Sequence, residues 1–155
     1  MAKELYVGKI LTNDMINVGK QLVQRLEATI PISDSFWFYV SEAESWRLFI
    51  VSPRALTEGP LAVCHIVVNT LNADNDDEYA LSFFNVSVTD EHYPYVSLLR
   101  NVRLSDELFD TRLTGVGVNG SGYIEDAYIY HLYANAESFH SQATDVNEEL
   151  AVAMA

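Results

Sequence analysis

Positive charge is scarce in this chain of 155 residues, which has nine lysines and arginines against 22 aspartates and glutamates, a net charge of −13. Phosphate affinity comes mostly from lysine and arginine side chains that displace counterions, so this imbalance argues against direct binding to nucleic acid. The excess is concentrated, because residues 73–92 hold six acidic and no basic side chains. We expect this charge to keep the protein soluble. It also supports a sharper hypothesis, an acidic face that docks on a basic partner.

Cysteine and long apolar runs are scarce too. The single Cys64 cannot form an internal disulfide, which is typical of a chain in a reducing compartment. No run of about eighteen apolar residues is present, and the N-terminal region has no long apolar block behind basic residues. We therefore expect a cytoplasmic protein without a signal peptide or a membrane span.

Motifs for metals and cofactors are missing as well. His92, His131 and His140 do not have the spacing of metal ligands, and neither a CxxC nor an HExxH motif accompanies them. The acidic stretch NADNDDEY, residues 72–79, lacks the glycine and the glutamate of a helix-loop-helix calcium site. We expect no bound metal and no cofactor.

Two short patterns imitate catalytic motifs. GVGVNG, residues 115–120, matches GxGxxG, but a strand pattern rather than a helix follows it, so we expect a hairpin bend and no dinucleotide site. Cys64 and His65 carry a nucleophile and a base, but neighbours on a helix point about 100° apart and cannot form a dyad. Cys64 is expected to be a small core residue. We infer that the protein is not an enzyme.

Apolar residues, by contrast, are plentiful at 49% and evenly spread, which predicts one globular domain over residues 1–133. The acidic tail, residues 134–155, is either a short helix or disordered. Apolar spacing of three and four predicts a helix over residues 12–30, capped by Thr12 or Asn13. Gly59-Pro60 begins a second helix, and because that helix is apolar nearly all round we expect it to be buried.

Runs of β-forming residues predict the strands, and proline and serine mark short helical turns between them. The expected strands are residues 36–40 and 46–52, which form a hairpin, residues 81–88, and residues 112–118 and 123–133, which form a second hairpin; helical turns are expected after Pro94 and Ser105. This order predicts an α+β fold, a mainly antiparallel sheet of about five strands with helices packed on one face.

The first hairpin has aromatic and apolar residues on both sides. Phe36 and Phe38 alternate with Trp37 and Tyr39, so neither face of the sheet is polar. The second face therefore needs a cover as well. Either short helices or the tail cover it, or a subunit or a partner does.

The run GSGYIEDAYIYHLYA, residues 120–134, comes closest to a functional site. Strand alternation places Glu125 and Asp126 on opposite faces, so they cannot act as an acid and base pair on one substrate. Each carboxylate is expected to need a partner of its own, for Glu125 either Arg112 or His131. Alternation puts these residues on the face of Asp126: Ile124, Tyr128, Tyr130 and Leu132. It puts these on the face of Glu125: Tyr123, Ala127, Ile129, His131 and Tyr133.

Two sets of candidate binding residues follow. One set combines an arginine, two carboxylates, two tyrosines and a histidine: Arg47, Glu125, Asp126, Tyr128, Tyr130 and His131. The other is an acidic surface expected to face a partner: Asp74, Asp76, Asp77 and Glu78.

Three segments together resemble small uncharacterised bacterial α+β proteins. They are the hairpin WFYVSEAESWRLFIVSP at residues 37–53, the helix start at Gly59-Pro60 and NGSGYIEDAYIY at residues 119–130. The resemblance spans about residues 12–133, and its specific marks are Trp46, Arg47, Ser52, Pro53 and Glu125–Tyr130. It implies a shared fold, and it implies no catalytic residue because those proteins have no established activity.

The missing catalytic motifs and the two-faced hairpin favour a non-enzymatic, acidic protein-binding module that self-associates as a homo-oligomer. Two alternatives stay open. An acidic inhibitor or immunity-type protein would imitate nucleic acid and block a nucleic-acid-binding enzyme. A small-molecule enzyme or sensor would use Arg47, Glu125 and His131 together with nearby tyrosines.

Overall fold

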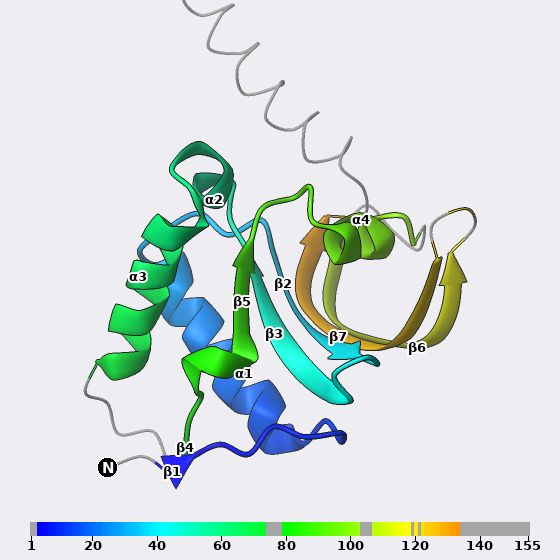
Figure 1. The fold of residues 1–155 in the computed structure, drawn as a ribbon, viewed down its shortest axis with the longest axis horizontal. Helices are drawn as coiled ribbons and strands as arrows, with labels where there is room; N and C mark the ends of the chain where they lie inside the picture. Colours follow the sequence, from blue (N-terminus) through cyan, green and yellow to red (C-terminus); the bar gives the residue numbers. More distant parts are fainter. Residues whose placement is uncertain (1–2, 74–78, 103–106, 119, 121, 134–155) are drawn as a thin grey trace, which may run out of the picture.

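Five strands form one sheet in the computed structural model, which describes residues 3–73, 79–102, 107–118, 120 and 122–133 (Figure 1). The strand order is β5-β3-β2-β7-β6, and neighbouring strands are antiparallel except for β3 and β5. The α+β class predicted from the sequence is confirmed. The bounds of the strands are β2 (Asp34–Val40), β3 (Ser45–Val51), β5 (Val86–Thr89), β6 (Glu107–Val118) and β7 (Gly122–Tyr133).

A second, smaller sheet is parallel and has two strands, β1 (Lys3–Glu4) and β4 (Tyr79–Ala80). It brings the start of the described chain beside the segment that follows the second long helix. Strands of two residues carry no periodicity, so the sequence could not predict them.

The first predicted helix is confirmed as α1 (Asn13–Glu27). The hydroxyl of Thr12 accepts a hydrogen bond from the backbone N–H of Met15 at 3.2 Å, which is the expected N-cap. The buried residues of α1 recur at helical spacing and face the sheet: Met15, Gly19, Leu22, Val23 and Leu26.

The second predicted helix is confirmed as α3 (Pro60–Asn72), which begins at the expected proline. Its predicted burial is wrong for most of its residues. Within α3 only Val63 and Val67 are buried, and Leu61 is 70% exposed. The outward side of α3 is mostly polar, because His65, Asn69 and Asn72 are exposed together with Leu61.

The remaining short elements are partly as predicted. Helix α4 (Pro94–Arg100) confirms the turn expected after Pro94. The turn expected after Ser105 is wrong for residues 107–110, which begin strand β6, whereas Ser105 itself lies outside the described residues. Helix α2 (Pro53–Thr57) was not predicted.

The strand predicted over residues 81–88 is only half right. A 3-10 turn, η1 (Phe83–Asn85), precedes β5. The hydroxyl of Ser82 accepts a hydrogen bond from the backbone N–H of Phe84 at 3.3 Å. Such local bonds compete with strand pairing, and they explain why two β-forming phenylalanines lie outside the sheet.

Strict alternation along β7 is wrong at two points, because the β6–β7 hairpin bends. The bends lie opposite two β6 residues with left-handed backbone, Asp110 (φ 44°) and Gly115 (φ 63°). Such kinks re-aim the side chains that follow them. The hydrophobic core on one face of the sheet therefore contains four β7 residues that are spaced by three, two and three positions: Ile124, Ala127, Ile129 and Leu132.

Two hydrophobic cores lie on the two faces of the sheet (Figure 1). Helices α1 and α3 cover one face, and this helix-side core includes Trp37 and Tyr130. Helix α4 and the curved β6–β7 hairpin enclose the other face, and this curl-side core includes Phe36, Phe49 and Leu99. The chain's own elements therefore cover the second face. Helix α4 is the exception to the prediction that helices pack on one face.

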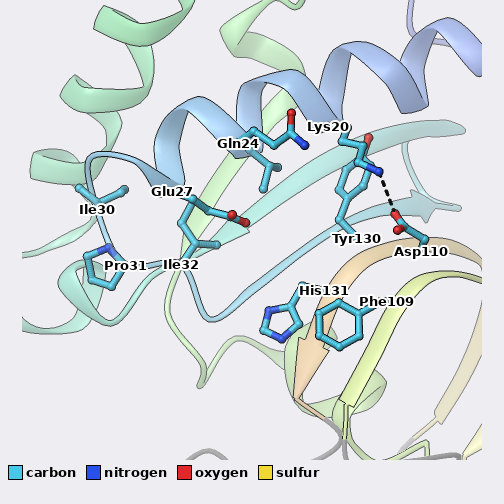
Figure 2. A pocket seen from close by; sticks show the side chains of 11 residues that line it. Lys20, Gln24, Glu27, Ile30, Pro31, Ile32, Phe109, Asp110, Tyr130 and His131 are labelled. Atoms are coloured by element: carbon cyan, nitrogen blue, oxygen red, sulfur yellow. Dashed lines mark ion pairs between the residues drawn. The ribbon is translucent and has the colours of Figure 1, made fainter.

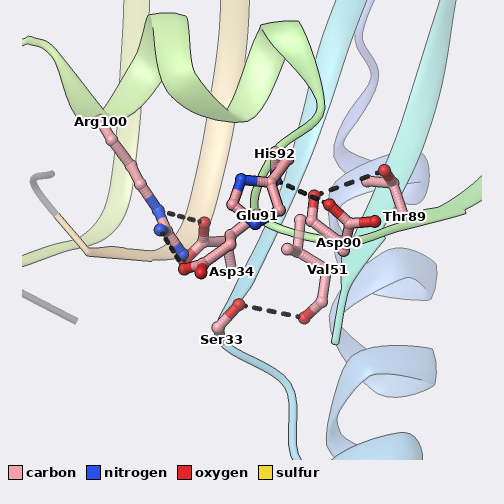
Figure 3. Close-up of polar contacts among 8 residues, drawn as sticks. All are labelled: Ser33, Asp34, Val51, Thr89, Asp90, Glu91, His92 and Arg100. Carbon is pink, nitrogen blue, oxygen red and sulfur yellow. Dashed lines mark hydrogen bonds and ion pairs between the residues drawn. The ribbon is translucent and has the colours of Figure 1, made fainter. Parts of the chain in front are cut away.

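A buried ion pair links α4 to the start of β2. Nε and Nη2 of Arg100 donate to the carboxylate of Asp34 at 2.8 and 3.0 Å, and Nη1 donates to Glu91 at 3.1 Å (Figure 3). The side chains of Arg100 and Asp34 are 1% and 0% exposed. A buried charge costs several kcal/mol unless it is paired, so these carboxylates allow the arginine to be buried.

Candidate functional site

Turn η1 and the flank of α3 form a partly exposed apolar surface, which we call the α3–η1 surface. Leu61, Phe83 and Phe84 are exposed, and Cys64, Val68 and Leu71 are half-buried. Four of its residues share one stripe of α3, because their spacing of three, four and three positions returns to one side of a helix. Turn η1 contacts α3 and adds two aromatic rings. The residues of the α3–η1 surface are Leu61, Cys64, Val68, Leu71, Phe83 and Phe84.

Phe84 is the most exposed large apolar residue of the described chain, at 87%. Its neighbour Phe83 lines a shallow hollow of about 280 Å³ between η1 and α3, together with Val68 and Leu71. Single exposed apolar residues are ordinary, but a contiguous group beside a hollow marks a contact surface.

Helix α3 contains no acidic side chain and no lysine or arginine from Pro60 to Asn72, and its exposed residues include His65. Burial raises the pKa of the Cys64 thiol, which therefore stays protonated near neutral pH. The hollow beside η1 does carry charge, because Glu4 also lines it.

A groove of about 510 Å³ runs between α1 and the far end of the β6–β7 hairpin (Figure 2). Lys20, Gln24 and Glu27 of α1 form one wall, and Phe109 and His131 lie across from them. The apolar part of its lining comes from both sides and from the segment after α1: Val23, Ile30, Pro31, Ile32 and Tyr130.

The charges around this groove are mixed and partly paired. Lys20 and Asp110 approach to 3.8 Å across the groove (Figure 2), and both side chains are about half exposed. The His131 ring stacks on Phe109 with 4.8 Å between ring centroids, and its Nε2 lies 3.6 Å from the carboxylate of Glu107. An exposed pair of this kind contributes little binding energy, so the groove has no strong charge preference of its own.

Tyr130 and His131 are the two candidate residues that line this groove. Tyr130 is mainly structural. Its hydroxyl accepts a hydrogen bond from Nε1 of Trp37 at 2.8 Å and donates to the carbonyl of Ile16 at 2.6 Å. Tyr128 packs against Tyr130 in the helix-side core.

The other candidate residues lie elsewhere. Arg47 of β3 donates to the Ser87 hydroxyl at 2.8 Å and to a backbone carbonyl of β5, so it stabilises the pairing of these strands. Asp126 accepts hydrogen bonds from Arg112 at 2.7 and 3.1 Å and from Thr114 at 2.9 Å. Asp126 therefore has a partner of its own, Arg112 on the neighbouring strand.

The prediction that Glu125 pairs with Arg112 or His131 is wrong. Glu125 is exposed, Arg112 is bonded to Asp126, and the carboxylate near His131 is that of Glu107. The structure does not bring Arg47, Glu125 and His131 together into one site. The alternation of a regular strand does not include the bend opposite Gly115. This bend turns Glu125 toward solvent.

The predicted acidic partner surface, Asp74, Asp76, Asp77 and Glu78, lies outside the described residues, and so does the tail at residues 134–155. Within the described part of the chain, no cluster of three histidine, cysteine or acidic side chains could hold a metal ion. No helix among the described residues is long and apolar enough to cross a membrane.

The outer edge of β6 is poorly suited to the addition of another strand. Among the described residues β6 pairs only with β7, but the kinks at Asp110 and Gly115 leave just residues 111–114 regular between them. Arg112 lies in this stretch, and its charge and the two kinks are devices that protect sheet edges from strand addition.

The chain matches no protein-family model, no curated protein and no solved structure. The resemblance to small bacterial α+β proteins therefore stays a prediction, and the function has to be argued from the surface itself.

The α3–η1 surface was missed at the level of sequence, although a signal for it existed. Helix α3 is apolar nearly all round, which predicts burial inside the chain, and Phe83-Phe84 lies in a run of β-forming residues that predicts a core strand. The same pattern also suits a helix that is half buried by its own chain and half covered by a partner. The groove residues Lys20 and Phe109 had no such signal, since they are far apart in the sequence.

Proposed function

We propose that this protein is a non-enzymatic protein-binding module that uses the α3–η1 surface. The observation that carries the proposal is the 87% exposure of Phe84 beside the exposed Phe83 and a hollow lined by Val68 and Leu71 of α3. Aromatic anchors surrounded by apolar side chains dominate the energy of protein interfaces. Exposed aromatic side chains of this kind lower the solubility of a protein. A role in binding explains why they are nevertheless present.

The candidate residues with titratable side chains lie apart from one another in the fold. This arrangement supports a role in binding rather than in catalysis. The carboxylate of Asp126 is bonded to Arg112, and Arg47 is bonded to Ser87. A catalytic acid and base must both reach one substrate, and these side chains lie on different strands with partners of their own.

The test compares wild type with Phe84→Ser as immobilised baits. Purified wild-type chain and a cell lysate are offered to each bait, and any captured protein is purified and titrated directly. We expect binding to wild type and at least a roughly tenfold loss with Phe84→Ser, since removing an aromatic anchor typically costs more than about 1.4 kcal/mol. Tyr123→Ser, which removes another exposed aromatic on the hairpin, is the matched control and should bind normally. If no binding partner distinguishes Phe84→Ser from the control, the proposal is wrong.

A further inference from the structure

We propose that the groove between α1 and the β6–β7 hairpin binds a free amino acid with a large apolar side chain, such as leucine or phenylalanine. This inference concerns a different surface from the proposed protein-binding site, because neither Phe83 nor Phe84 lines the groove. Three features of the groove carry it: two opposite charges at one end, an apolar region at the other end, and the backbone conformation of Asp110.

The charged end of the groove is built from both of its walls. Lys20 of α1 and Asp110 of β6 face each other there, with 3.8 Å between Nζ and a carboxylate oxygen and with both side chains about half exposed (Figure 2). A pair this exposed contributes little to stability, so a ligand can replace it at small cost. An amino acid replaces the one loose contact with two, its carboxylate on Lys20 and its ammonium on Asp110. A ligand with a single charge would leave one wall without a partner.

The backbone at Asp110 is unusual for a residue in a strand. Its φ of 44° lies in the left-handed region, which is uncommon outside glycine, although aspartate and asparagine tolerate it best. The register between β6 and β7 passes from Phe109 to Thr111 without Asp110, whose carboxylate leaves the sheet and points across the groove to α1 (Figure 2). Strained positions of this kind cluster at ligand sites. The kink therefore presents a carboxylate to the groove that a regular strand would not place there.

The opposite end of the groove is apolar. Ile30 and Pro31 lie there, away from the Lys20–Asp110 pair (Figure 2). Val23 and Ile30 belong to the helix-side core, so their side chains are held in place by packing. Burial of an apolar ligand side chain at this end supplies a driving force for binding. The groove volume of about 510 Å³ is typical of small-molecule sites.

Glu27 and Phe109 favour one orientation of the ligand. Glu27 lies on α1 between the two ends of the groove (Figure 2), where its carboxylate attracts the ligand's ammonium and repels the ligand's carboxylate. The ligand's carboxylate is thereby directed to Lys20. Phe109 is 60% exposed and stacks on His131, and its ring offers an aromatic surface to the ligand's side chain.

Isothermal titration calorimetry of the wild-type chain with L-phenylalanine and L-leucine tests the site. We expect both amino acids to bind. Phenethylamine lacks the carboxylate and 3-phenylpropionate lacks the ammonium, so each should bind at least roughly tenfold more weakly than L-phenylalanine. Glycine has both charges but no apolar side chain, and it should also bind at least roughly tenfold more weakly.

Asp110→Asn removes the charge and keeps a side chain that tolerates the left-handed backbone. The affinity for L-phenylalanine should fall at least roughly tenfold, while thermal melting stays close to that of wild type. Glu44→Gln is the matched control. Glu44 is also acidic and left-handed (φ 50°) and lies 3.5 Å from the exposed Lys9, but it does not line the groove. This variant should bind L-phenylalanine like wild type.

The two analogues assign each charge of the ligand to its wall. Lys20→Gln should weaken the binding of 3-phenylpropionate and leave that of phenethylamine no weaker. Asp110→Asn should have the opposite effect, because its lost carboxylate contacts only the ammonium.

Several results would overturn the proposal. They are the absence of binding by both amino acids, an affinity that Asp110→Asn leaves unchanged, and an analogue with one charge that binds as tightly as L-phenylalanine. An equal loss in Asp110→Asn and Glu44→Gln would trace the effect to overall charge and would contradict a site in the groove. None of these results depends on Phe84, so the proposed protein-binding function stands or fails separately.

Discussion

At the scale of single residues, α1 packs closely against the sheet at Gly19, with Tyr130 and Trp37 beside it. A methyl group on Gly19 would overlap the hydroxyl of Tyr130 and would lie 2.7 Å from Nε1 of Trp37. We predict that Gly19→Ala lowers the free energy of unfolding by about 1–3 kcal/mol, although alanine is the better helix former. Urea denaturation measures this. Gly117→Ala, where no atom lies within 4 Å, is the control and should change stability by no more than about 0.5 kcal/mol. Equal losses in both variants would contradict the packing argument.

Tyr130 gives a second prediction at this scale. Burial raises the pKa of Tyr130 well above its usual value, so its phenol stays neutral in the folded protein. The unfolded chain ionises this phenol near about pH 10, and the folded chain does not, so stability is fully present below about pH 10 and falls as the pH rises beyond it. Urea denaturation between about pH 9 and pH 11 should show this fall. Tyr130→Phe should be less stable at neutral pH, and its stability should depend less on pH; an unchanged slope would refute this assignment.

At the scale of elements, α4 depends on a buried charge pair for its attachment to β2. We predict that Asp34→Asn lowers the free energy of unfolding by about 3–5 kcal/mol, because the buried Arg100 guanidinium loses a carboxylate that accepts two of its hydrogen bonds. Asp126→Asn is the matched control. It changes the same bidentate geometry to Arg112, whose side chain is 48% exposed, and should cost no more than about 1 kcal/mol. Comparable losses would show that burial does not govern the Asp34 pair.

An element could be predicted from the sequence when the residues that determine it lie close together in the chain. Helix α1 has its cap, apolar stripe and terminating proline within twenty residues, so its bounds were correct to a few positions. The start of β6 at residues 107–110 is different, because pairing with β7 overrides a locally helical pattern. Residues 83–85 were assigned to a strand for their β-forming side chains, but the hydroxyl of Ser82 holds them in a turn.

At the scale of the whole molecule, the net charge of −13 opposes the compact state, because like charges repel one another across its surface. We predict that the free energy of unfolding rises as sodium chloride rises from about 0.02 M to about 0.5 M, where the screening length drops severalfold. Urea denaturation at each salt concentration measures it. A free energy of unfolding that falls with added salt would mean that attractive ion pairs outweigh this repulsion.

The sequence by itself determined the α+β class, the first hairpin, the long helices and the acidic character, because each depends on composition or on periodicity within one segment. Only the tertiary structure decided what covers each face of the sheet and which apolar residues stay exposed. Both depend on contacts between distant segments, such as α4 with β7 and η1 with α3. The exposed side of α3 is the clearest case. Its composition predicts that the helix is buried, whereas the fold buries only Val63 and Val67 and leaves Leu61 70% exposed.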